Sequence, residues 1–139
     1  MNILIRIVAL GVVAAGMSAT TLAHHSFAAI FDSSKEMKVT GTLTKVEWVN
    51  PHSYFYVDVK DASGKVTTWS FENFPPAMMA RLGFKRDTMV SRIGKTVTVS
   101  YNPALKAGEP LGYGRVFDFQ GGPKIEFTPP DENGYADVK

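Results

Sequence analysis

The amino-acid sequence predicts a small, mainly β-structured domain that follows an N-terminal leader. From Val39 onward, apolar and polar residues alternate in several short stretches, and Gly, Asn, Asp and Pro separate these stretches. A single stretch with helical character, about two turns long, interrupts the pattern. A hydrophobic content of 45% with 12% aromatic residues is enough to form a core, although the chain has no cysteine and therefore no disulfide.

The first 23 residues have the features of a secretory signal peptide. One positive charge at Arg6 precedes an apolar run over residues 7–17, and small or polar residues follow as far as Ala23. The apolar run of about 11 residues suits a signal core and is too short for a membrane span. We therefore expect cleavage after Ala23, a mature chain that begins at His24, a periplasmic or secreted location, and no transmembrane anchor in the mature form.

The mature chain is expected to contain one domain. Removal of 23 of the 139 residues would leave 116, which is too few for two domains. We expect the domain to cover residues 24–128 and residues 129–139 to form a flexible C-terminal tail. The remaining 14 basic and 13 acidic side chains nearly balance, so the surface has no electrostatic footprint for nucleic acid. The lack of cysteine also excludes thiolate metal sites.

The first predicted strand runs from Val39 to Trp48 and contains a change of phase. Apolar and small residues occupy alternate positions as far as Leu43, and the apolar phase then moves to Val46 and Trp48. One extra residue in a strand has this effect, so the pattern predicts a β-bulge. Asn50-Pro51 ends the strand, because proline cannot donate a ladder hydrogen bond and Asn favours turns.

The next two stretches predict a β-hairpin that covers residues 54–61 and 66–72. A short turn over residues 61–64 joins them. Tyr54, Tyr56 and Asp58 share one face of the first strand, which we expect to point outward. The residues of the opposite face, together with the apolar phase of the later strands, are expected to form a common core: Phe55, Val57, Trp69, Phe71, Val97 and Val99.

A short helix and two further strands complete the predicted domain. Asn73 could cap the helix, a proline occupies its first turn, residues 77–82 continue it, and Gly83 ends it. The later strands cover residues 97–101 and 115–120, and a Gly-Gly turn leads into a short apolar run at 125–127. This order of elements predicts an OB-like five-stranded barrel with one short helix, and a small β-sandwich is the alternative.

Two stretches resemble an uncharacterised family of small secreted bacterial proteins. They are HHSFAAIFD at residues 24–32 and VTGTLTKVEWVNPHSYFYVDVKDASGK at residues 39–65, in which HHSF and EWVNPH are the most specific motifs. The resemblance extends from His24 to about Asp118 and implies a signal peptide and a single β-rich domain. It implies no activity, because the family has none established. Ile30 stands where similar sequences have an acidic residue, which weakens any scheme that uses a carboxylate at that position.

All three histidines of the chain are candidate metal ligands. His24 and His25 would lie at the new amino terminus, and His52 follows the Asn50-Pro51 turn. A free amine and the imidazole of the same residue can chelate a metal, and planar sets of nitrogen ligands suit Cu(II). We therefore expect an exported binding protein that holds Cu(II) through His24, His25 and His52, and we expect no catalytic activity.

Two alternatives remain open from the sequence. His52 could be a loop histidine bonded to a backbone carbonyl or to Glu47, and His24 and His25 could form a solvated chain end. The protein would then be a metal-free OB-like module that binds a peptide, a glycan or an envelope protein on its barrel face. Glu47 and Glu72 are interpreted as ordinary outward strand carboxylates, and Met78 with its neighbour as core residues.

Overall fold

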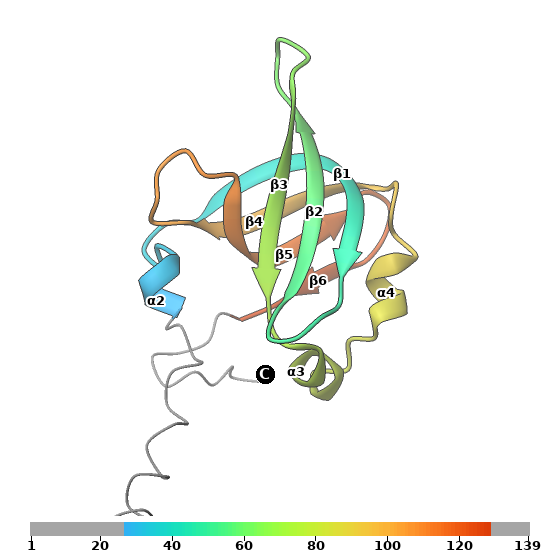
Figure 1. Ribbon diagram of the computed structural model, residues 1–139. Coiled ribbons are helices and arrows are strands. Elements are labelled where there is room, and N and C mark those ends of the chain that lie inside the picture. Colours follow the sequence, from blue (N-terminus) through green and yellow to red (C-terminus); the bar gives the residue numbers. More distant parts are fainter. Residues whose placement is uncertain (1–26, 129–139) are drawn as a thin grey trace, which may run out of the picture.

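The computed structural model describes residues 27–128, which form a closed β-barrel with an extra strand and short helices (Figure 1). The sequence predicted this mainly β fold. The helices and strands are, in chain order, α2 (Phe27–Ile30), β1 (Met37–Glu47), β2 (Ser53–Lys60), β3 (Val66–Asn73), α3 (Pro76–Arg81), α4 (Arg86–Val90), β4 (Thr96–Pro103), β5 (Leu111–Phe119) and β6 (Lys124–Glu126).

The strand order identifies the barrel as OB-like. Neighbouring strands follow the order β3-β2-β1-β4-β5-β6, and a parallel pairing of β3 with β5 closes the first five into a barrel. The closing pairs are Ser70 with Leu111 and Glu72 with Tyr113, with one further pair between them. A sandwich would leave two separate sheets, so closure confirms the barrel and excludes the alternative. The strand β6 adds to β5 outside the closed set.

The strand β1 pairs with strands on both of its sides and contains a bulge. Its first half pairs with β4 and its second half with β2. The register with β2 shifts between Leu43 and Lys45, which confirms the predicted bulge. At Gly41 a Cβ atom would overlap the backbone of Asp58, so only glycine allows β1 to pass this close to β2.

The predicted core is confirmed for five of its six residues. Phe55, Val57, Phe71, Val97 and Val99 are fully buried, whereas Trp69 is only partly buried against them. Aromatic rings fill the centre of the barrel, with the ring of Phe55 5.0 Å from that of Phe117 in an edge-on arrangement.

Short helices close the barrel. The predicted helix is confirmed as α3, which contributes the buried Met79. Asn73 does not cap it: Asn73 ends β3, its side chain bonds Gly114 and Phe74, and Pro75 precedes the helix. Helices α4 and α2 were not predicted, because five and four residues are too few to establish a helical period. In the part of the chain that the structure describes, no helix is long and apolar enough to cross a membrane.

The strand β5 begins four residues before its predicted start at Arg115. Gly112 and Gly114, which precede the predicted start, are both buried strand residues, although glycine is depleted in strands on average. A Cβ atom at Gly112 would overlap the ring of Tyr101, and one at Gly114 would overlap the ring of Phe117. The two glycines therefore make room for core aromatic residues.

The hairpin of β2 and β3 projects beyond the rest of the barrel (Figure 1). Its turn is held by the Asp61 carboxylate, in which Oδ1 accepts hydrogen bonds from the backbone N–H groups of Ser63 at 2.8 Å and Lys65 at 3.0 Å. The predicted leader, the predicted tail and the candidate ligands His24 and His25 lie outside the described residues.

Candidate functional site

The candidate site is centred on His52, in the loop between β1 and β2. His52 Nδ1 lies 2.6 Å from Glu72 Oε1. The hydroxyl of Tyr54 donates to Glu72 Oε2 at 3.2 Å. Glu72 lies opposite Tyr54 in the antiparallel ladder of β2 and β3, which places both side chains on the outer face of the barrel. Both carboxylate oxygens of Glu72 are therefore engaged.

The expected alternative partner of His52, Glu47, is used elsewhere. Its Oε2 accepts a hydrogen bond from the Tyr56 hydroxyl at 2.8 Å, and its Oε1 pairs with the Lys45 ammonium. The Lys45 Nζ also lies 5.0 Å from the centre of the Tyr56 ring. These contacts, first with Lys45 and then with Tyr56, lower the pKa of Glu47. Glu47 is thus paired with Lys45 of its own strand β1 and with Tyr56 of β2, and not with His52.

The 2.6 Å contact with Glu72 bears on what the His52 ring can offer. When Nδ1–H of a neutral imidazole donates to a carboxylate, the lone pair is on Nε2. Metal-bound histidines in proteins commonly have this support, in which a carboxylate fixes the ring and raises its basicity. The Glu72 side chain is 12% exposed and that of His52 is 29% exposed, so the supporting carboxylate is sheltered while the ring reaches the surface.

Tyr54 keeps its proton across the physiological range. Burial, followed by the negative charge of Glu72, raises the pKa of Tyr54 to about 12. Its hydroxyl is therefore a constant hydrogen-bond donor to Glu72. This second bond orients the carboxylate that orients His52.

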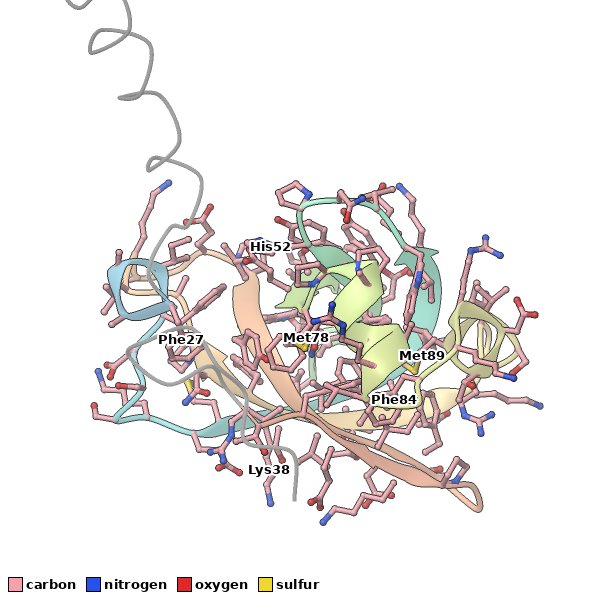
Figure 2. The ribbon with its side chains drawn as sticks, turned by 90° about the horizontal axis from the view of Figure 1, so that it is seen from below. Phe27, Lys38, His52, Met78, Phe84 and Met89 are labelled. Atoms are coloured by element: carbon pink, nitrogen blue, oxygen red, sulfur yellow. The ribbon has the colours of Figure 1, made fainter. Side chains whose placement is uncertain are left out.

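The described chain begins beside this site. In the closing pair of the barrel, Tyr113 of β5 lies next to Glu72 of β3. The ring of Phe27, on α2, packs edge-on against the Tyr113 ring at 5.1 Å between centroids. Figure 2, which views the molecule from below, shows Phe27 on α2 and His52 on the β1–β2 loop. Tyr113 is thus the structural link between the start of the described chain and the Glu72–His52 pair.

Backbone contacts fix α2 in this position. Phe31 forms a β-bridge with Ala104, and the N–H of Leu105 donates to the carbonyl of Ile30 at 2.8 Å. The Phe31 ring also lies 6.0 Å from that of Tyr113. Ile30 takes part through its backbone, so the absence of an acidic side chain there does not disturb this contact.

The three candidate ligands have different outcomes. His52 lies in the site, whereas His24 and His25 precede the described residues. Within residues 27–128, no group of three or more His, Asp or Glu side chains could hold a metal ion. Met79 is fully buried and Met78 partly buried in the core, which agrees with their interpretation as packing residues.

Sequence reasoning missed the role of Glu72 and Tyr113. Glu72 was expected to point outward, and it does. Counting the hairpin register from the turn would have placed it opposite Tyr54, so this contact had a signal in the sequence. Tyr113 had no such signal, because its position depends on the parallel pairing that closes the barrel.

Comparison with known proteins places the chain in a family. Residues 11–113 match the model of a family of unknown function (DUF6152). The chain belongs to this family. The DUF6152 match includes His24, His25, His52 and Glu72 and ends at Tyr113. No curated protein and no solved structure matches the chain.

Proposed function

We propose that this chain is an exported protein that binds Cu(II), with His52 as one nitrogen ligand. The amine and imidazole of His24, freed by cleavage after Ala23, supply the others, with His25 as a further imidazole. One observation carries the proposal: Glu72 Oε1 lies 2.6 Å from Nδ1 of His52, the position in which a carboxylate supports a histidine that binds a metal through Nε2.

Chain length allows the proposed ligands to meet. His24 is three residues before Phe27, and three extended residues span at most roughly 10 Å. The Phe27 ring packs on Tyr113, and Tyr113 neighbours Glu72 across strands that are separated by about 4.8 Å. The proposal requires the imidazoles of residues 24 and 25 to reach the space beside His52 across this short segment.

Electrostatics also favours a cation at this place. Glu72 forms no ion pair with a lysine or arginine of residues 27–128. A carboxylate that is 12% exposed and has no permanent cation beside it favours a bound cation. Nitrogen ligands in a planar set select Cu(II) among the divalent ions.

The experiment must use protein whose first residue is known, because the proposed amine ligand is that of His24. The protein is exported from a bacterial host, its first residue is established by intact mass, and Cu(II) is titrated with visible and EPR detection. We expect one Cu(II) per chain and a signal typical of nitrogen ligands. A mass that places the first residue beyond His25 would contradict the proposal.

A matched variant carries one extra residue before His24. The extension converts the chelating amine into an amide, so we expect the Cu(II) affinity to fall by at least about 100-fold while the melting temperature of the metal-free protein is unchanged. His52→Ala should weaken binding by less. Equal affinity of the extended and the native chain would exclude the amine as a ligand.

The alternative is a metal-free module that binds a peptide, a glycan or an envelope protein. Tyr54 and Tyr56 favour this function, because both lie partly buried on the outer face of β2, the face that OB barrels use for ligands. Failure of the exported protein to bind Cu(II) would favour this module. Binding to glycan and peptide arrays, with Tyr56→Ala as the control, would then identify the ligand class.

A further inference from the structure

The excess positive charge of the described chain is concentrated in residues 81–95, which we call the basic segment. The basic segment contains five basic side chains and one acidic side chain, whereas the rest of residues 27–128 contains eight basic and nine acidic ones. Its basic members are Arg81, Lys85, Arg86, Arg92 and Lys95. The near balance of charge over the whole chain therefore conceals an uneven distribution.

The cations of the basic segment have few counter-charges. Arg86 lies 4.0 Å from Asp87, whose side chain is 94% exposed. The other four cations form no ion pair within residues 27–128. Most basic side chains elsewhere in these residues do pair with a carboxylate: Lys35, Lys45, Lys106, Arg115 and Lys124. The positive charge of the basic segment is thus not neutralised by the described domain.

The fold gathers this charge at one side of the barrel. Helices α3 and α4 lie beside each other there, and the segment continues into the turn that leads to β4 (Figures 1 and 2). Four of the basic side chains are exposed, and Arg92 is partly buried. The guanidinium carbon of Arg92 lies 5.3 Å from the centre of the Phe119 ring, so this charge has a fixed position without a carboxylate.

An exposed isoleucine lies in the turn after α4. Ile93 is 43% exposed, and in the sequence it stands between Arg92 and Lys95. The turn is tied to β1, because the N–H of Gly94 donates to the carbonyl of Leu43 at 2.7 Å and the N–H of Leu43 donates to the carbonyl of Lys95 at 3.1 Å. An ordered turn therefore holds an apolar side chain in water among cations.

We propose that the basic segment is a docking surface for a membrane that contains anionic phospholipids. The lysine and arginine side chains contact the lipid phosphates, and Ile93 enters the apolar layer below the headgroups. Attraction between exposed charges extends over about 8 Å at physiological ionic strength, so cations on α3, on α4 and in the turn act together on one membrane surface. This inference is independent of the proposed Cu(II) site.

The exposed Ile93 favours a membrane over a soluble polyanion. A nucleic acid also offers phosphates, but proteins hold its single strands by stacking bases on aromatic side chains. The aromatic residue of the basic segment, Phe84, is partly buried, with its ring 4.8 Å from that of Phe127. A membrane offers an apolar layer directly beside its phosphates, which matches an apolar side chain beside cations.

The test measures binding of the exported protein to vesicles by sedimentation. Intact mass first verifies that the apolar leader is absent, because an uncleaved leader would itself bind lipid. We expect binding to vesicles of phosphatidylcholine with phosphatidylglycerol, no binding to phosphatidylcholine alone, and weaker binding as sodium chloride is added. The triple variant Lys85→Gln, Arg86→Gln, Lys95→Gln should bind the anionic vesicles about 100-fold more weakly.

A matched triple variant removes the same charge elsewhere. Lys38, Lys60 and Lys65 are exposed and, like most cations of the basic segment, form no ion pair within residues 27–128. Their replacement by Gln should weaken vesicle binding by less than about threefold, because these side chains lie outside the docking surface. Both triple variants should melt at the temperature of the native chain.

A second pair of variants tests the apolar contact. Ile93→Ser should weaken binding to anionic vesicles roughly fivefold, because part of its apolar surface no longer leaves water. Leu105, in the loop between β4 and β5, is 56% exposed and lies outside the basic segment. Leu105→Ser should leave vesicle affinity unchanged.

Three results would overturn the proposal. A native protein that binds neither kind of vesicle, or binds both equally, excludes docking on anionic lipid. Equal losses in the two triple variants show that only net charge matters. Native affinity of Ile93→Ser for vesicles, together with tighter binding of the native protein to single-stranded RNA in fluorescence anisotropy, identifies a soluble polyanion as the partner. Cu(II) titration of the same samples keeps the test of the proposed function separate.

Discussion

Two carboxylates on the outer face of the barrel have nearly the same surroundings and one decisive difference. Glu47 and Glu72 each accept a hydrogen bond from a tyrosine of β2, Tyr56 and Tyr54 respectively. The other carboxylate oxygen contacts the ammonium of Lys45 in Glu47 and the imidazole of His52 in Glu72. Lysine has a permanent charge at neutral pH and no lone pair to offer, but a neutral imidazole has a lone pair and no charge.

The exposure of the two carboxylates sharpens this contrast. The side chain of Glu47 is 33% exposed, and that of Glu72 is 12% exposed. The carboxylate that is better shielded from water therefore has an imidazole as its partner, and the more exposed one has a permanently charged ammonium.

Among changes at the two carboxylates and their partners, the largest expected effect comes from giving Glu72 a lysine partner like that of Glu47. His52→Lys gives Glu72 the type of partner that Glu47 has, so we expect Cu(II) affinity to fall by up to about 100-fold, since a nitrogen ligand is lost. The metal-free protein should melt at the same or a higher temperature, because the carboxylate gains a charged partner. Chelator competition and a thermal melt measure both quantities. Native-like copper binding by His52→Lys would exclude this residue as a ligand.

The second test removes the charge of each of the two carboxylates in turn. Glu72→Gln retains an acceptor for His52 but removes the charge, and we expect the Cu(II) affinity to fall by about 10- to 30-fold, as at other supported histidine ligands. The matched variant Glu47→Gln should leave copper affinity unchanged. Equal losses in the two variants would show that only the general negative charge of the face matters.

The third test compares Tyr54, which bonds Glu72, with Tyr56, which bonds Glu47. Tyr54→Phe removes the bond that orients Glu72, so we expect about threefold weaker Cu(II) binding and a loss of about 1 kcal/mol in the free energy of unfolding. Tyr56→Phe should cost a similar amount of stability without affecting copper. Urea denaturation measures the first quantity and chelator competition the second. A loss of copper affinity in Tyr56→Phe of equal size would argue against the assignment.

The smallest effect is expected from pH in the metal-free protein. The pKa of Tyr54 is about 12 in the folded chain, against an ordinary value of 10.0. The folded state therefore holds this proton more tightly, and the resulting stability is complete below pH 10 and declines as the pH rises toward 12. Glu47 has a lowered pKa, so its contribution is present above its ordinary value and declines in acid. Urea denaturation as a function of pH should show the alkaline decline, and Tyr54→Phe should reduce it.

The sequence could predict those parts of the molecule that depend on local alternation. The hairpin of β2 and β3, its buried Phe55 and Phe71, and the bulge in β1 follow from period and phase. The early start of β5 could not be predicted, because glycine is on average more common in loops than in strands. Gly112 leaves room for a core aromatic ring, and this becomes clear only from the packing. The one-turn α2 had no period to detect.

His52 could be singled out from the sequence as part of the candidate site, but the residues that contact it could not. His52 attracted attention because histidine is rare in this chain and this one follows a turn. Its bond to Glu72 depends on register across two strands, and the position of Tyr113 depends on a contact between β3 and β5 that are about 40 residues apart. No local pattern encodes a pairing at that separation.

The turn at Asp61 has a practical consequence for handling the protein. A tag before His24 would block the amine that we propose as a ligand, so reporters and surface anchors need another place. The Asp61–Lys65 turn closes through its own carboxylate, and it lies at the far end of β2 from His52, roughly 25 Å away along an eight-residue strand. A cysteine introduced at exposed Ser63 would be unique in this chain, and a spin label or fluorophore attached there would test for the proposed copper from a known distance without touching the site.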